Sequence, residues 1–157
     1  SVSKLTAAER LSALNLHNQV RAEVGVGQLT WSEQLAGVAQ QWADHIAASG
    51  RMQHRPRSGA GASQFGENLA MGFDSSGGYT VISGINSWYQ EKAAFRPGQT
   101  VSNGNLQAVG HYTQMVWKGS TQVGMGKAII QTGPQRGWLI VVANYNPPGN
   151  FLGQAPY

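Results

Sequence analysis

The sequence predicts an α+β fold, a three-layer α-β-α sandwich in which helices cover a central, mainly antiparallel sheet. Apolar residues recur at helical spacing behind two capping-box signals in the first third of the chain. Near the C-terminus, two strand-like runs are joined by a short Gly/Pro turn. The second run, 139–143, is apolar without alternation, which is typical of a strand covered on both faces. The chain is expected to form one domain over residues 1–157, with a Pro/Gly-rich tail over 147–157.

The first two helices follow from their start signals. Thr6 and Glu9 have the spacing of a capping box, and the helix behind them is expected to run to about Gly25. The same signal at residues 30–33, next to a short turn, starts a second helix that is expected to end at Gly50. Its apolar face is traced by Leu35, Val38, Ala39, Trp42, Ala43 and Ile46. Each helix therefore has one face to bury.

A third helix is expected over residues 80–95, because apolar side chains recur on one face and Pro97 stops the helix. A short fourth helix is expected around His111. The segments 51–66 and 96–109 are rich in Gly and polar residues, and both are predicted to be loops.

Two strands are predicted over residues 122–132 and 138–144, joined as a hairpin by the turn 133–137. The string Gly124-Met125-Gly126 lies inside the first of them. We interpret it as strand glycines, because a lone Gly-x-Gly does not make a phosphate-binding loop.

Composition narrows the possible partners. Lys and Arg number 11 against 7 Asp and Glu, a net charge of +4, so the chain is expected to be attracted to anionic surfaces. No groove-reading motif accompanies this charge, so nucleic acid is not an expected partner. No apolar run reaches the roughly 18 residues of a membrane span. There is no cysteine, and the start at Ser1 without an apolar leader is typical of a mature or trimmed product.

The most informative segment is 110–117, Gly-His-Tyr-Thr-Gln-Met-Val-Trp. On a helix, His111 and Gln114 share one face, and their apolar neighbours indicate burial. A buried polar pair needs hydrogen-bonding partners. The candidate partners elsewhere in the chain are His54, Glu67 and Glu91.

Each candidate also has an ordinary structural interpretation. Glu91, three residues after Trp88, fits a surface glutamate on a helix edge, and His54 alone fits a loop histidine. Glu67 alone fits a carboxylate that accepts hydrogen bonds from loop amides. Two further histidines, His17 and His45, are predicted to lie on helix surfaces.

Four motifs occur in order along the chain: His17-Asn18-x-x-Arg21, 66–70 (Gly-Glu-Asn-Leu-Ala), 111–114 (His-Tyr-Thr-Gln) and 144–151 (Asn-Tyr-Asn-Pro-Pro-Gly-Asn-Phe). With these motifs, nearly the whole chain resembles the CAP (SCP/TAPS) superfamily, which includes the plant pathogenesis-related-1 proteins. The resemblance implies the CAP fold and a central cavity lined by two histidines and two acids. Matched motif by motif, the cavity residues are His54, Glu67, Glu91 and His111, with Gln114 beside them.

The resemblance further implies that His54 and His111 bind a divalent cation, usually zinc. Two imidazoles are fewer than the three protein ligands of most catalytic zinc sites, so binding is expected to be weak and pH-dependent. No catalytic residue is established, although Glu67 and Glu91 are the candidates. No His-Glu-x-x-His motif and no Gly-x-Ser-x-Gly elbow is present.

The chain departs from the family pattern at several positions. Met125 and Ala143 stand where many members have cysteine. The tail 147–157 looks like the one that some pathogenesis-related-1 proteins release as a signalling peptide. Asn146 replaces the aspartate of the plant cleavage pattern, so we expect the tail to stay packed over the sheet.

Three functions fit these features. The first is a secreted protein that binds a small hydrophobic or amphiphilic ligand such as a sterol or fatty acid. The second is a metal-dependent hydrolase of peptides or cell-wall polymers, and the third is a non-catalytic signalling or effector protein. The resemblance implies an extracellular location, or the periplasm or cell envelope if the source is bacterial.

Overall fold

The computed structural model describes residues 1–73 and 75–157. In chain order its elements are α1 (Ala7–Glu23), β1 (Thr30–Trp31), α2 (Glu33–Ser49), β2 (Gly66–Gly72), α3 (Val81–Gln90), the 3₁₀ helix η1 (Glu91–Ala94), α4 (Leu106–Met115), β3 (Gln122–Ile129) and β4 (Leu139–Asn146). The strands form one sheet in the order β1-β3-β4-β2. Strands β2 and β3 run antiparallel to β4, and β1 runs parallel to β3.

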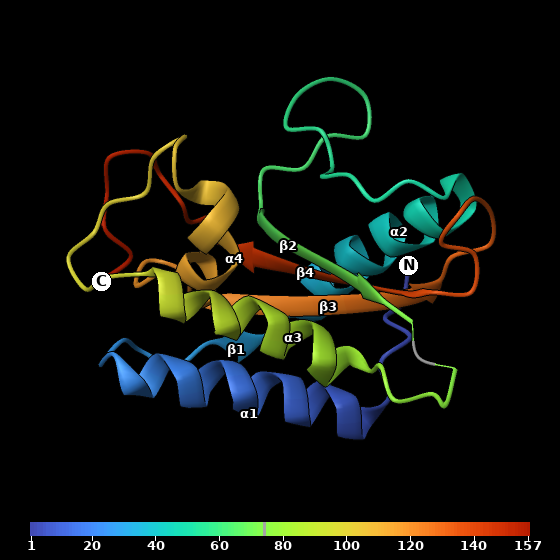
Figure 1. The fold of residues 1–157 in the computed structure, drawn as a ribbon, viewed down its shortest axis with the longest axis horizontal. Helices are drawn as coiled ribbons and strands as arrows, with labels where there is room; N and C mark the ends of the chain where they lie inside the picture. The colour runs from blue at the N-terminus through green and yellow to red at the C-terminus, as the bar shows by residue number, and fades with distance from the viewer. Residues whose placement is uncertain (74) are drawn as a thin grey trace.

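Helices cover both faces of this sheet, so the predicted α+β sandwich is confirmed (Figure 1). The unbroken apolar run in β4 is explained by this covering of both faces. Ile140 and Val142 pack into a cluster with α2, whereas Val141, Ala143 and Tyr145 pack into the cluster formed with α1, α3 and α4. Successive side chains of a strand point to opposite faces, so every side chain of the run packs into an apolar layer.

Two glycines bring α2 directly onto β3. A Cβ at Gly126 would lie 2.5 Å from the Cα of Gln40, and one at Gly124 would overlap the backbone of Ala36. A helix backbone approaches a strand this closely only where the strand has no side chain. The interpretation of Gly124 and Gly126 as strand glycines is confirmed.

The two helix starts differ in how well they were predicted. The capping box of α1 is present, because Thr6 Oγ1 accepts from the Glu9 amide at 3.1 Å and Glu9 Oε1 accepts from the Thr6 amide at 2.8 Å. The predicted cap of α2 at Thr30 is wrong, since the N-cap is Ser32. Thr30 belongs instead to β1, where its amide donates to the carbonyl of Thr121 at 3.0 Å.

Strand β2 was not predicted, although it is an edge of the sheet that carries part of the site. Its residues pair with β4 over the full length, from Gly66 opposite Tyr145 to Gly72 opposite Leu139. Because the partners lie more than 60 residues apart, the pairing leaves no local signal in the sequence.

The tail packs against α4 and the segment that follows it, which corrects the expected position over the sheet. The Gly149 amide donates to Gln114 Oε1 at 3.0 Å, and Asn150 Nδ2 donates to the Gly110 carbonyl at 2.8 Å. Farther along, the Lys118 amide donates to the Pro156 carbonyl at 2.7 Å. In the part of the chain that the structure describes, no helix has the length and apolar character needed to cross a bilayer.

Candidate functional site

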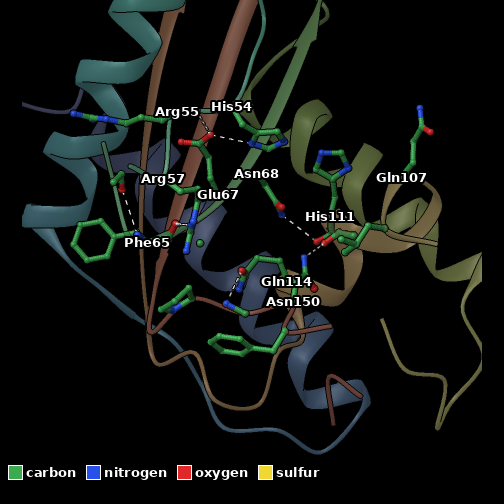
Figure 2. A pocket seen from close by; sticks show the side chains of 17 residues that line it. His54, Arg55, Arg57, Phe65, Glu67, Asn68, Gln107, His111, Gln114 and Asn150 are labelled. Carbon is green, nitrogen blue, oxygen red and sulfur yellow. Dashed lines mark hydrogen bonds and ion pairs between the residues drawn. The ribbon is translucent and has the colours of Figure 1, made fainter. Parts of the chain in front are cut away.

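A pocket of about 610 Å³ opens where the loop 51–66, β2, α4 and the tail meet. Four of the residues predicted for the cavity, His54, Glu67, His111 and Gln114, line it (Figure 2). The fifth, Glu91, is not among the lining residues, but its carboxylate contacts the lining residue His111.

Strand β2 holds Glu67 so that its carboxylate orients His54. Glu67 Oε1 accepts from His54 Nδ1 and from the Arg55 amide, each at 2.9 Å. Asn144, opposite Glu67 in β4, donates to Oε2 at 3.4 Å. The Glu67 side chain is 8% exposed and that of His54 is 63% exposed, so a buried acid holds an accessible imidazole. With Nδ1 on the carboxylate, Nε2 is the ring nitrogen left for a ligand.

The second pair has the same arrangement on other elements. Glu91, the first residue of η1, accepts from His111 Nδ1 at 2.6 Å, and its other oxygen accepts from the amides of His111 and Tyr112 at 2.9 and 3.1 Å. The Trp88 ring stacks on the His111 ring with centroids 6.2 Å apart. The imidazole of His111 is therefore held at one edge and one face, and Nε2 is again the remaining nitrogen.

Two imidazoles oriented by carboxylates fit the chemistry of a cation site. A carboxylate on Nδ1 fixes the tautomer and makes Nε2 a better ligand. Within residues 1–73 and 75–157, no group of three or more His, Cys, Asp or Glu side chains converges to hold an ion. If an ion bound here, the two Nε2 atoms would be its protein donors, and water or a bound ligand would complete the coordination. Such a donor set suits weak binding.

The placement of His17 corrects the prediction of a helix-surface histidine, since the residue is 0% exposed. Its Nδ1 lies 2.9 Å from the Ala13 carbonyl, which only accepts, so Nδ1 carries the proton. Its Nε2 therefore accepts from the Tyr145 hydroxyl at 2.7 Å. Burial, with a smaller contribution from the charge of Arg21, lowers the pKa of His17 to about 4. The spacing of the sequence indicates this burial, because His17 follows Ala13 by one helical turn and so lies on the buried face of α1. By contrast His45 is on the surface as predicted, stacked on Trp42.

The same buried hydrogen bonds reach the pocket. Asn68 Nδ2 donates to the Tyr145 hydroxyl oxygen at 3.3 Å and to the His111 carbonyl at 3.0 Å. Burial raises the pKa of Tyr145, which keeps its hydroxyl neutral as a donor. A chain of hydrogen bonds thus connects α1 through β4 and β2 to α4. Its members come from all four of the sequence motifs, but their contact was not predicted.

Two further motif residues, Arg21 and Gln114, use their side chains for hydrogen bonds within the protein. Arg21 is buried, and its guanidinium donates to the carbonyls of Met115 and Trp117, both at 2.9 Å, and of Ser120 at 3.0 Å. Desolvation by burial lowers the pKa of Arg21 to about 10, so the group remains a cation at neutral pH. Gln114 is equally occupied, because Nε2 donates to Ser120 Oγ at 3.1 Å while Oε1 accepts from Gly149. Gln114 therefore forms part of the pocket wall.

Comparison with known proteins places the chain among related sequences and folds. The family model described as "CAP: Cysteine-rich secretory protein family" matches residues 14–145. Pathogenesis-related protein 1C of Nicotiana tabacum is 40% identical over 146 residues, 92% of this chain and 78% of that protein. Pathogenesis-related protein 1 of Arabidopsis thaliana is 35% identical over 144 residues, 92% of this chain and 80% of that protein. The crystal structure of NaASP2 with Zn²⁺ has the same fold, with a TM-score of 0.78 and 22% identity over 98% of this chain and 86% of that chain.

Proposed function

Since this chain belongs to the CAP (cysteine-rich secretory protein) family, we propose that it is a secreted binding protein whose pocket holds a weakly bound divalent cation, zinc, through His54 and His111. Beside the cation the pocket takes a small amphiphile such as a sterol or fatty acid. The observation that carries the proposal is that both imidazoles line one pocket with Nδ1 bound to a carboxylate.

A bound cation would supply a Lewis-acidic centre for an oxygen atom of the ligand. The protein supplies the rest, since Glu67 and Glu91 orient the rings and Trp88 restrains His111. Both carboxylates accept hydrogen bonds from backbone amides as well as from imidazoles. A carboxylate held this way is a poor general base, which favours binding over hydrolysis.

Calorimetric titration with Zn²⁺ tests the cation site. We expect binding at pH 7.5 that weakens towards pH 5.5, because protonated imidazoles cannot bind a metal. The His54→Ala/His111→Ala double variant is expected to lose the site. His45→Ala is the matched control, because His45 is exposed on α2 outside the pocket. Unchanged affinity in the double variant would refute the assignment.

Ligand exchange with radiolabelled sterol and palmitate tests whether the protein binds an amphiphile. Saturable binding of either compound is the expected result. If neither binds, the protein has no lipid-type function in this pocket, and the cation site would then have to be explained by another activity.

A further inference from the structure

Arg57 lies in the pocket although it belongs to none of the family motifs. In Figure 2 its side chain lies between Glu67 and Phe65. Nη1 donates to the Phe65 carbonyl at 2.7 Å and Nη2 to the Gln64 carbonyl at 3.4 Å, while Gln64 Nε2 donates back to the Arg57 carbonyl at 2.5 Å. The loop therefore holds the guanidinium in place. Two of the five N–H groups of an arginine are used in this way, which leaves three for a ligand.

The charge of Arg57 has no acidic partner among the described residues. Glu67 accepts from His54, the Arg55 amide and Asn144. The neighbouring Arg55 is directed elsewhere, since its side chain runs toward α2, donates to Gln41 Oε1 at 2.9 Å and lies over the Trp42 ring (Figure 2). Arg57 thus provides an uncompensated positive charge in the pocket. A cation on the two imidazoles would make this region more positive still.

Apolar groups complete the pocket beside this charge. Phe65, Pro148 and Phe151 line it, and Phe151 is 50% exposed. An exposed aromatic side chain at a pocket mouth provides apolar surface that a ligand can cover. The pocket therefore presents a cationic group and an apolar surface to the same ligand.

We propose that the ligand of this pocket is an anionic amphiphile, and that Arg57 binds its oxyanion headgroup and so determines the preference over neutral amphiphiles. The inference rests on the proposed function, because it assumes that this pocket is the ligand site. A guanidinium matches the geometry of a carboxylate or a phosphate, and such charge-assisted hydrogen bonds are stronger than neutral ones.

Binding of three probes with the same chain length tests the inference: decanoate, decyl phosphate and decanol. The two anions distinguish a carboxylate from a phosphate headgroup, and decanol reports on the apolar surface alone. We expect the wild-type protein to bind at least one anion about tenfold more tightly than decanol. Added NaCl is expected to weaken binding of the anion and leave decanol unaffected. This salt comparison needs no variant.

The variants assign the preference to Arg57. Arg57→Gln is expected to weaken binding of the preferred anion about tenfold and leave decanol binding unchanged, whereas Arg57→Lys retains part of the preference. Arg136→Gln, in the β3–β4 turn, removes the same charge from an exposed position outside the pocket and is expected to change nothing. Circular dichroism and unchanged decanol affinity establish that the loop of the Arg57→Gln variant is intact.

The outcomes separate this inference from the proposed function. Equal wild-type affinity for the anions and decanol, or an Arg57→Gln variant that keeps the preference, would overturn the role of Arg57 while the pocket remains a ligand site. Absence of binding by all three probes would remove the amphiphile function itself. Repeating the titrations in EDTA shows whether Arg57 acts without the cation.

Discussion

Each histidine of the pocket is bound through Nδ1 to a carboxylate, but the two carboxylates differ in what else they hold. Glu67 holds the accessible loop histidine and one loop amide. Glu91 accepts from two successive amides of α4 in addition to the imidazole. Loss of either acid would therefore free one ring to turn and let its tautomer change.

Glu67→Gln and Glu91→Gln are each expected to weaken Zn²⁺ binding by about 10–100-fold with the fold retained. In Glu91→Gln the single carbonyl oxygen can accept from His111 Nδ1 or from the amides of α4, but not from both. In Glu67→Gln a neutral amide replaces the charge beside His54, and its NH₂ group faces the donor Asn144 Nδ2. Calorimetric titration measures the affinity. Glu33→Gln serves as the control, because Glu33 is an exposed residue of α2 that pairs with Arg10. If both pocket variants bind zinc like the parent, the two acids have a structural role only.

His17 makes stability depend on pH in a defined window. Its pKa is lowered by burial from 6.5 to about 4. Between these values the unfolded chain binds a proton that the folded chain does not, so the free energy of unfolding rises with pH. The stabilisation is complete above about pH 6.5 and is lost as the pH falls towards 4. The full shift corresponds to roughly 3 kcal/mol.

Urea unfolding of the wild type and His17→Gln from pH 4 to pH 7 measures this contribution. We expect the variant to be less stable at pH 7, because the two buried contacts of the imidazole, with the Ala13 carbonyl and the Tyr145 hydroxyl, are lost. Its free energy of unfolding should also change less over the window than that of the wild type. Parallel pH profiles for the two proteins would show that His17 does not titrate as described.

Among the elements, α2 and β3 have the closest packing. Their contact depends on the two glycines of β3, while the other face of the sheet is filled by large side chains such as Trp88 and Tyr145. The backbone of α2 therefore lies directly on the sheet, whereas large side chains separate the other helices from it. In the strand order β1-β3-β4-β2, β4 is an inner strand and β2 is the edge strand beside the pocket.

Gly126→Ala is expected to lower the free energy of unfolding by about 1–3 kcal/mol, because the new Cβ must push α2 away from β3. The atom in its way belongs to the backbone of Gln40, 2.5 Å from the ideal Cβ position. Gly27→Ala is the matched control, since nothing lies within 4 Å of a Cβ there. Thermal unfolding compares the two variants, and equal midpoints would contradict the packing argument.

Across the whole molecule, the pocket is built from segments that are far apart in the chain. The loop 51–66, β2, α4 and the tail each contribute one side, and Gln114 connects the last two. The tail is thereby part of the pocket wall. A change in its attachment is expected to alter the pocket as well as the tail.

Gln114→Ala is expected to loosen the tail, because Gly149 and Ser120 each lose a partner. The Gly149 amide is orphaned, whereas Ser120 Oγ still donates to the Pro147 carbonyl, so we expect a loss of about 1–3 kcal/mol. Hydrogen exchange at the amides of residues 149–157 measures the effect, and faster exchange is expected. Gln107→Ala, on the exposed side of the same helix, is the control and should leave exchange unchanged. Protection equal to that of the wild type in Gln114→Ala would mean that other contacts hold the tail.

Where the signal is local, the sequence determined the structure by itself. The capping box of Thr6 and Glu9 starts α1, and the apolar run of β4 predicts a strand covered on both faces. Both follow from neighbouring residues, whose conformational preferences and periodicity are visible without a partner. The ordered motifs likewise identified the CAP family, which the family model and the relatives confirm.

Only the tertiary structure decided which of these residues meet. Strand β2 becomes a strand through pairing with β4, and that pairing sets Glu67 opposite Asn144. His17 looked like a surface histidine because a polar residue on a helix is exposed unless it finds a buried partner, and its partner Tyr145 lies 128 positions away. Arg57 belongs to no motif, and its place in the pocket results from the path of the loop 51–66. These contacts depend on chain segments that the fold brings together, so no local pattern records them.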